Sequence, residues 1–108
     1  MADSNKVLSL LGLAKKAGKL SGGEFMTEKC VKEGRSQLVI VAEDASNNTK
    51  KNFHDMCTFY EVPIIELGSK EELGKWTGTE MRASLSVNDP GFASSIVKKY
   101  DSFREMEE

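Results

Sequence analysis

The sequence has few of the residues that metal sites, disulfide frameworks and hydrolytic active sites require. It contains one histidine, His54, and two cysteines, Cys30 and Cys57, which lack CxxC spacing. A zinc site built from histidine and cysteine needs more ligands than these. Two widely separated cysteines are typical of reduced thiols in the cytoplasm. We therefore expect no metal, no cofactor and a cytoplasmic location.

Long apolar runs and leader-like features are also missing. No run approaches the roughly 20 apolar residues of a membrane helix. The first residues, Met1 to Ser4, lack the basic start and the small-residue cleavage site of a signal peptide. A length of 108 residues suits one hydrophobic core. We predict a single domain over residues 1–108 and no membrane partner.

The charge balance excludes a strongly basic nucleic-acid binder, but the charges are unevenly distributed. The chain has 15 Lys and Arg against 17 Asp and Glu. Acids are absent from Ser4 to Gly23, a segment that carries four lysines, whereas residues 101–108 hold four acids and one arginine. This asymmetry predicts an acidic helical tail from about residue 101 and a basic N-terminal side that permits RNA binding. We expect no DNA partner.

Helical and strand-like segments alternate along the chain. Apolar spacing and capping residues predict five helices, from Ser4 to Gly18, Gly23 to Gly34, Ser46 to Tyr60, Ser69 to near Gly78, and one after Asp89-Pro90-Gly91. Strands are predicted at Lys19–Ser21, Gln37–Ala42, Val62–Leu67 and Ala83–Val87. The second strand is apolar throughout, as a central strand is, and the fourth alternates like a strand covered on one face. The pattern predicts an α/β fold, a three-layer α/β/α sandwich with a small mixed sheet of about four strands.

The sequence gives little indication of an enzyme. The chain has no GxSxG, GxxxxGK[ST], HExxH or GxGxxG motif. Cys57 falls on the apolar stripe of its helix and His54 toward solvent, so we expect a buried thiol and a surface imidazole rather than a catalytic pair. Glu43-Asp44 follows the central strand, where a helix cap or loop role is favoured over a metal or sugar site. We expect no catalytic residues.

The strongest local signal is the segment from Lys19 to Lys29. Gly22 and Gly23 precede a helix and leave its first amides open, where the helix dipole attracts phosphate. Phe25, Met26 and Lys29 can share a face that packs on an unstacked base. Composition alone favours the alternative that Phe25 and Met26 fill the core. The neighbouring basic side chains fit a solvated face and a phosphate-facing patch equally well; they are Lys15, Lys16 and Lys19.

Several ordered motifs resemble one family. They are Leu11-Gly12-Leu13-Ala14-Lys15-Lys16-Ala17-Gly18-Lys19, Lys29-Cys30-Val31-Lys32-Glu33-Gly34, Gln37–Ala45, Val62-Pro63-Ile64, Ser69-Lys70-Glu71-Glu72-Leu73-Gly74 with Gly78, and Asp89-Pro90-Gly91-Phe92-Ala93. Together they resemble the ribosomal protein L7Ae family, closest to its bacterial YlxQ-like branch, from about Lys6 to Ala93. The resemblance implies a three-layer α/β/α sandwich, no catalysis, and binding of RNA kink-turns or related folded RNA in ribosomes and other ribonucleoprotein particles.

The resemblance also implies a contact site. The family's strong kink-turn binders open the second helix with a glycine, an Asn-Glu pair that reads base edges, and a lysine. Gly23 and Lys29 match that pattern, but Phe25 and Met26 stand where Asn and Glu would be. Neither side chain can replace the lost hydrogen bonds. The family's second contact loop falls at Glu80-Met81-Arg82, where Arg82 replaces a proline and either contacts the RNA backbone or points into water.

Two hypotheses follow. The first is a non-catalytic RNA-binding protein, associated with the ribosome or another structured RNA, with altered kink-turn recognition. Its predicted RNA-contacting residues are Lys15, Lys16, Lys19, Gly22, Gly23, Glu24, Phe25, Met26, Lys29, Glu80, Met81 and Arg82. The alternative is a protein-interaction adaptor that keeps the fold but has lost RNA, with an exposed Phe25 and Met26 patch beside Trp76 or Met81.

Overall fold

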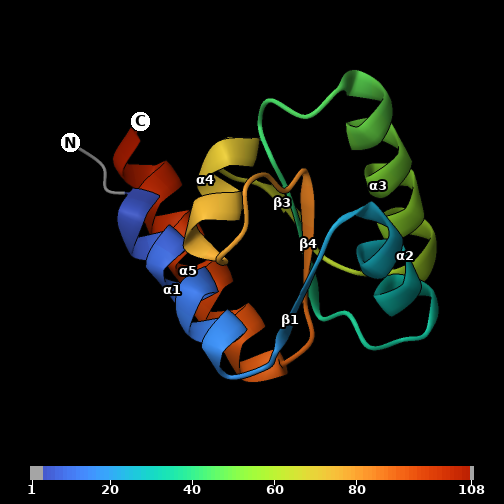
Figure 1. Ribbon diagram of the computed structural model, residues 1–108, viewed down its shortest axis with the longest axis horizontal. Coiled ribbons are helices and arrows are strands. Elements are labelled where there is room, and N and C mark those ends of the chain that lie inside the picture. Colours follow the sequence, from blue (N-terminus) through green and yellow to red (C-terminus); the bar gives the residue numbers. More distant parts are fainter. Residues whose placement is uncertain (1–3, 108) are drawn as a thin grey trace.

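The structure is a computed structural model that describes residues 4–107, five helices and four strands (Figure 1). In chain order these elements are α1 (Ser4–Lys16), β1 (Leu20–Gly22), α2 (Glu24–Lys32), β2 (Leu38–Val41), α3 (Asn47–Tyr60), β3 (Ile64–Glu66), α4 (Lys70–Trp76), β4 (Ser84–Val87) and α5 (Pro90–Glu107). Each predicted helix and strand is present. The main difference in bounds is at the first helix, which ends at Lys16 rather than near Gly18, and Ala17 beyond its end is exposed.

The four strands form one mixed sheet in the order β1-β4-β2-β3. β4 runs antiparallel to both of its neighbours, with Leu20 opposite Val87 on one side and Ile40 opposite Leu85 on the other. β2 and β3 are parallel, which a chain connection through α3 allows. This order brings the start of the chain beside its last strand, although more than 60 residues separate them in sequence.

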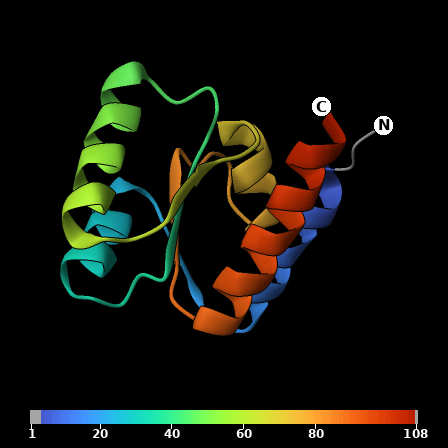
Figure 2. The same cartoon turned by 180° about the vertical axis from the view of Figure 1, so that it is seen from behind.

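Helices cover both faces of the sheet, which confirms the three-layer α/β/α sandwich. α1, α4 and α5 pack on one face, and α2 and α3 pack on the other (Figures 1 and 2). β2 lies inside the sheet and all four of its residues are buried, as its continuous apolar run predicts. Burial from both sides explains why this strand carries no polar alternation.

The prediction that the fourth strand is covered on one face only is wrong. All four residues of β4 are buried, including Ser84 and Ser86. Their hydroxyl groups form hydrogen bonds with α2 and with the loop that follows it. Ser84 Oγ donates to Thr27 Oγ1 at 3.3 Å, and Ser86 Oγ donates to Ser36 Oγ at 2.8 Å. Hydrogen bonding removes the penalty of burying these hydroxyls. A polar alternation in sequence therefore does not mark an exposed face here.

Side-chain caps fix the starts of α3 and α4 as the sequence predicts. Ser46 Oγ accepts a hydrogen bond from Thr49 N at 3.1 Å, and Ser69 forms a capping box with Glu72. Asp44 Oδ1 accepts a hydrogen bond from Lys70 N at 2.8 Å, so this acid has the predicted capping role. The first turn of α4 is thereby held against the end of β2.

The two ends of the chain are only partly described. The predicted acidic tail from about residue 101 forms the last turns of α5, and Glu108 of that tail lies outside the described residues. The expectation about a signal peptide rests on residues 1–4, of which residues 1–3 also lie outside. Among the helices that the structure describes, none has the length and apolar character needed to cross a membrane.

Candidate nucleic-acid interface

The start of α2 lacks a side-chain cap. Gly23 occupies the capping position with φ 96° and ψ 157°, and the first turn of the helix receives no side-chain hydrogen bond. The N–H groups of the first turn have no partner within a helix, and the helix dipole gives them a partial positive charge. A hydrogen bond from Gly23 N to Ser84 O at 3.0 Å ties this helix end to β4. The geometry offers fixed donors to an anion.

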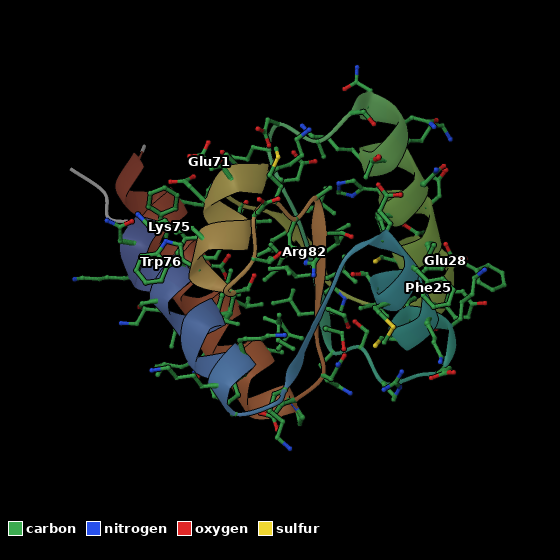
Figure 3. All side chains as sticks on the ribbon, in the orientation of Figure 1. Phe25, Glu28, Glu71, Lys75, Trp76 and Arg82 are labelled. Atoms are coloured by element: carbon green, nitrogen blue, oxygen red, sulfur yellow. The ribbon has the colours of Figure 1, made fainter. Side chains whose placement is uncertain are left out.

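Arg82 lies across the two glycines that precede α2. A Cβ atom on Gly22 would stand 2.8 Å from Arg82 Nε and 3.2 Å from its Cδ, and one on Gly23 would stand 3.7 Å from Nη1. A side chain at Gly22 would force Arg82 to move, whereas the distance at Gly23 is that of an ordinary van der Waals contact. Among the side chains that the structure describes, those of residues 5–105, Arg82 forms no ion pair. Its guanidinium group therefore adds a whole positive charge to an end of α2 that is already electropositive (Figure 3).

The loop that carries Arg82 is joined to α4 by backbone hydrogen bonds. Thr79 N donates to Gly74 O at 2.8 Å, and Arg82 N donates to Lys70 O at 3.0 Å. A Cβ atom on Gly74 would stand 2.6 Å from the carbonyl carbon and oxygen of Glu80, closer than real Cβ contacts allow. Gly74 thus lets this loop, residues 77–83, fold back along its helix. Gly74 belongs to one of the motifs that carry the family resemblance, but its role in seating this loop depends on a contact that no local pattern encodes.

The side chains of Glu80 and Met81 project from this loop. Both residues are exposed, and Met81 is 54% accessible. Arg82 is the member of the predicted trio that meets α2, since its side chain reaches Gly22 and Gly23. The structure therefore joins the two segments that were predicted separately, the glycine-opened helix and the later loop.

Phe25 is exposed, which contradicts the interpretation that it fills the core. Its accessibility is 76%. The buried residues of α2 are Thr27, Cys30 and Val31. At about 100° per residue, Phe25 lies about 200° from Thr27 and so faces away from the sheet. Met26 is half-buried at the border of the two faces, so the core interpretation fails for the aromatic residue.

Lys29 and Glu24 flank Phe25 on α2. Lys29 is exposed one turn after Phe25, on the same side of the helix, and forms no ion pair with any of the side chains described. Glu24 is also exposed, and its Oε1 accepts a hydrogen bond from Thr49 Oγ1 at 3.4 Å. This contact draws the one acid of the first turn toward α3. We call the surface formed by Gly22–Met26, Lys29 and Glu80–Arg82 the α2 face.

The other predicted basic residues lie elsewhere. Lys15 and Lys16 line a hollow between the ends of α1 and α4, together with Trp76. α4 covers the opposite side of the sheet from α2 (Figures 1 and 3). The prediction of a patch that joins Phe25 and Met26 to Trp76 is therefore wrong. Lys19 is exposed just before β1, where its carbonyl oxygen accepts a hydrogen bond from Asn88 N at 2.8 Å.

Cys57 and His54 do not form a nucleophile and base pair in the structure. Burial raises the pKa of the Cys57 thiol to about 11, so this group stays protonated at neutral pH. His54 instead contacts Glu66, with 3.0 Å between Nε2 and Oε2. In the part of the chain that the structure describes, no three His, Cys, Asp or Glu side chains cluster as metal ligands would. Cys57 and His54 thus occupy the buried and surface positions that their helix spacing predicts.

Comparisons with known proteins agree with this architecture. Residues 5–97 match the family model described as "Ribosomal protein L7Ae/L30e/S12e/Gadd45 family". The chain is 40% identical over 92 residues to the RNA-binding protein YlxQ of Bacillus subtilis strain 168, covering 85% of this chain and 92% of that protein. It is 42% identical over 88 residues to RNA-binding protein YlxQ of Enterococcus faecium, covering 82% and 84%. The resemblance inferred from the motifs is confirmed.

Solved structures show the same fold. A protein of unknown function from Bacillus halodurans superposes with a TM-score of 0.86 at 38% identity, covering 89% of this chain and 97% of that one. A 15.5 kD RNA binding protein from Giardia lamblia superposes with a TM-score of 0.75 at 25% identity, covering 93% and 88%. The arrangement of helices on both faces of a mixed sheet is therefore shared by distant relatives.

Proposed function

The chain belongs to the ribosomal protein L7Ae/L30e/S12e/Gadd45 family, and from this premise we propose that it is a non-catalytic, cytoplasmic RNA-binding protein. The α2 face is the proposed contact surface. One observation carries the proposal: Arg82 lies across Gly22 and Gly23 at the uncapped start of α2. A cation and several free amides at one place suit the phosphate backbone of a folded RNA.

Phosphate binding would involve three groups on the α2 face. The first-turn amides of α2 and the Arg82 guanidinium group would hold one phosphate by charge-assisted hydrogen bonds. Lys29 lies one turn further along the helix and would contact a neighbouring phosphate as a mobile point charge. These contacts position an RNA without reading its sequence.

Base recognition would differ from that of the strong kink-turn binders in the family. Phe25 stands where the family pattern has asparagine and Met26 where it has glutamate, so edge hydrogen bonds are replaced by apolar surface. An exposed phenylalanine stacks on an unpaired base without strong sequence preference. We propose a kink-turn-like or ribosomal RNA target, bound with altered recognition in which stacking on Phe25 takes over from edge reading.

A binding titration tests this function. The full chain is titrated against a kink-turn RNA and a straight duplex of equal length, at about 50 and about 200 mM salt, because phosphate contacts weaken steeply over that range. The proposal predicts salt-sensitive binding of both RNAs and a preference for the kink-turn. Equal binding of the two RNAs would remove the kink-turn part and leave a phosphate binder. Binding that ignores salt would contradict the proposal.

Two variants refine the titration. Lys29→Gln should reduce the slope of log affinity against log salt by about one unit, because one phosphate contact is lost. Phe25→Ala should abolish the preference for the kink-turn while keeping the salt dependence. Lys98→Gln is the matched control, since Lys98 is exposed on α5, away from the α2 face, and should change neither property.

The exposure of Phe25 also supports a second function. A phenylalanine that is 76% accessible fits a protein partner as well as a base. A protein-interaction adaptor would show no binding to either RNA at low salt. It would also lose its partner on Phe25→Ala, whereas Lys29→Gln would have little effect.

A further inference from the structure

The hollow between α1 and α4 lies on the opposite side of the sheet from the α2 face. It measures about 430 Å³ and lies between the C-terminal ends of α1 and α4, within the usual size range of ligand pockets. Its walls come from both helices and the turn after α4: Ser9, Gly12, Leu13, Lys15, Lys16, Lys75, Trp76, Thr77 and Gly78. Figure 3 shows Lys75 and Trp76 at the end of α4 that faces α1.

The inner wall of the hollow is apolar and partly open. Trp76 is half-buried, and Leu13 is 54% accessible. A Cβ atom on Gly12 would stand 3.2 Å from the Trp76 carbonyl oxygen and 3.9 Å from its Cε3 atom. This glycine lets the end of α4 approach α1 and brings the indole ring to the hollow. A flat aromatic ring at an open hollow is a stacking surface for another flat ring.

The rim of the hollow is positively charged. Lys15 and Lys16 come from the last turn of α1, and Lys75 comes from the last turn of α4. No acidic residue is among those that line the hollow, and none of the three lysines pairs with a carboxylate in residues 5–105, whose side chains the structure describes. Compensation of the helix dipoles explains lysines at these ends. It does not explain an accessible tryptophan and leucine between them.

We propose that this hollow binds an unpaired nucleotide, with the base stacked on Trp76 and the phosphate held by Lys15, Lys16 and Lys75. Aromatic platforms flanked by cations are the usual means of holding single-stranded nucleic acid. The same chemistry would accept a free mononucleotide. The RNA strand as the source of the nucleotide rests on the proposed function, because a chain bound at the α2 face would supply a second stretch of RNA.

The hollow carries its own reporter, because Trp76 is the only tryptophan in the sequence. Its fluorescence is followed while the full chain is titrated with single-stranded hexaadenylate, with AMP and with polyglutamate. N-acetyl-tryptophanamide serves as the control for absorption by the nucleotides. We expect saturable quenching by hexaadenylate that weakens with salt. Quenching by AMP at a comparable concentration would also support the site and identify a free nucleotide as its ligand.

A matched pair of double variants tests the lysines. Lys15→Gln with Lys16→Gln should weaken hexaadenylate binding roughly tenfold and lower the salt slope by about 1.4, at about 0.7 per phosphate contact on a single strand. Lys98→Gln with Lys99→Gln removes two adjacent exposed lysines from α5 and should leave both values unchanged. Trp76→Phe keeps an aromatic ring in the wall and should retain most of the binding, measured by anisotropy of labelled hexaadenylate.

The outcomes separate this site from the proposed function. Kink-turn binding without any change in Trp76 fluorescence, with hexaadenylate or AMP, would overturn the second site and leave the RNA-binding function standing. Quenching without kink-turn binding would support the site and count against that function. Equal quenching of the unmodified chain and the Lys15, Lys16 double variant would overturn the site. Stronger quenching by polyglutamate than by hexaadenylate would overturn it in favour of an acidic protein partner.

Discussion

α2 and α3 lie on the same face of the sheet but begin in opposite ways. The start of α3 is closed by Ser46, whose hydroxyl accepts a hydrogen bond from Thr49 N at 3.1 Å. The start of α2 is a bare glycine, Gly23, with no side-chain cap. A serine side chain thus satisfies a first-turn N–H group of α3, whereas the first-turn N–H groups of the neighbouring α2 receive no side-chain hydrogen bond.

The cations of α3 and those of the α2 face differ in a similar way, although Lys32, elsewhere on α2, pairs with Glu28 at 2.8 Å. On α3, Lys50 lies 3.3 Å from Glu66 and Lys51 lies 2.8 Å from Asp55. At the α2 face, Lys29 and Arg82 form no ion pair with described residues. Groups whose partners lie within the chain serve the fold, whereas donors and cations left open are available to a ligand. The comparison therefore supports the proposed interface at α2 and predicts that α3 is structural.

Gly74→Ala should have the largest effect, because it dislodges the loop side of the α2 face. The new methyl group would meet backbone atoms of Glu80 and Met81 at 2.6–2.7 Å, and backbone yields less easily than a side-chain tip. We expect the free energy of unfolding to fall by about 1–3 kcal/mol and RNA affinity to fall with it. Urea denaturation and RNA titration measure the two effects. Unchanged stability would show that the loop is not packed as described.

Arg82→Ala should separate binding from stability. Loss of the charge-assisted contacts should weaken RNA binding roughly 10- to 100-fold, while the free energy of unfolding changes by less than about 0.5 kcal/mol. Gly22→Ala should act in the same direction, because its Cβ would displace the Arg82 side chain. Full affinity in both variants, measured by anisotropy, would break the assignment of the interface to α2.

Ser46→Ala should give the opposite result on α3. Loss of the cap should lower the free energy of unfolding by about 1 kcal/mol, and RNA affinity should stay the same. Thermal or urea unfolding beside an RNA titration makes the measurement. A fall in affinity without a fall in stability would mean that α3, too, belongs to the interface.

Glu66→Gln should have the smallest effect, and the effect should depend on pH. Burial acts to raise the pKa of Glu66, but hydrogen bonds and charge from His54 and Lys50 outweigh it and lower the pKa below 4.5. The carboxylate therefore contributes stability above about pH 4.5, which is lost as pH falls through the folded-state pKa. Because Glu66 and its two partners are partly exposed, we expect this contribution to the free energy of unfolding to be about 0.5 kcal/mol. Unfolding curves at pH 7 and pH 3 should show a difference from the variant only at pH 7.

Much of the fold follows from local sequence signals. The apolar run Gln37–Ala42 predicts the buried strand β2, and the spacing of Ser69 and Glu72 predicts the capping box of α4. The order of the strands does not follow, because it is decided by packing between segments distant in sequence. β4 shows the limit most clearly, since the partners that bury its serines, Thr27 and Ser36, come from elsewhere in the chain.

The candidate site, too, could be predicted only where it depends on local sequence. Gly22 and Gly23 are visible as a local signal, because glycines before a helix leave its amides open. The position of Arg82 over them is not visible, since it requires β1 to pair with β4. The exposure of Phe25 could have been inferred from the phase of Thr27, Cys30 and Val31, but hydrophobicity alone favoured the core.

The most direct test is a map of backbone amide shifts by NMR during titration with a kink-turn RNA. The comparison of the two helices predicts large changes at residues 22–29 and 78–82, including the amides of the first turn of α2. It predicts small changes at residues 46–61, where α3 is capped and its lysines are paired. Changes concentrated on α3, with the α2 amides unmoved, would contradict the account.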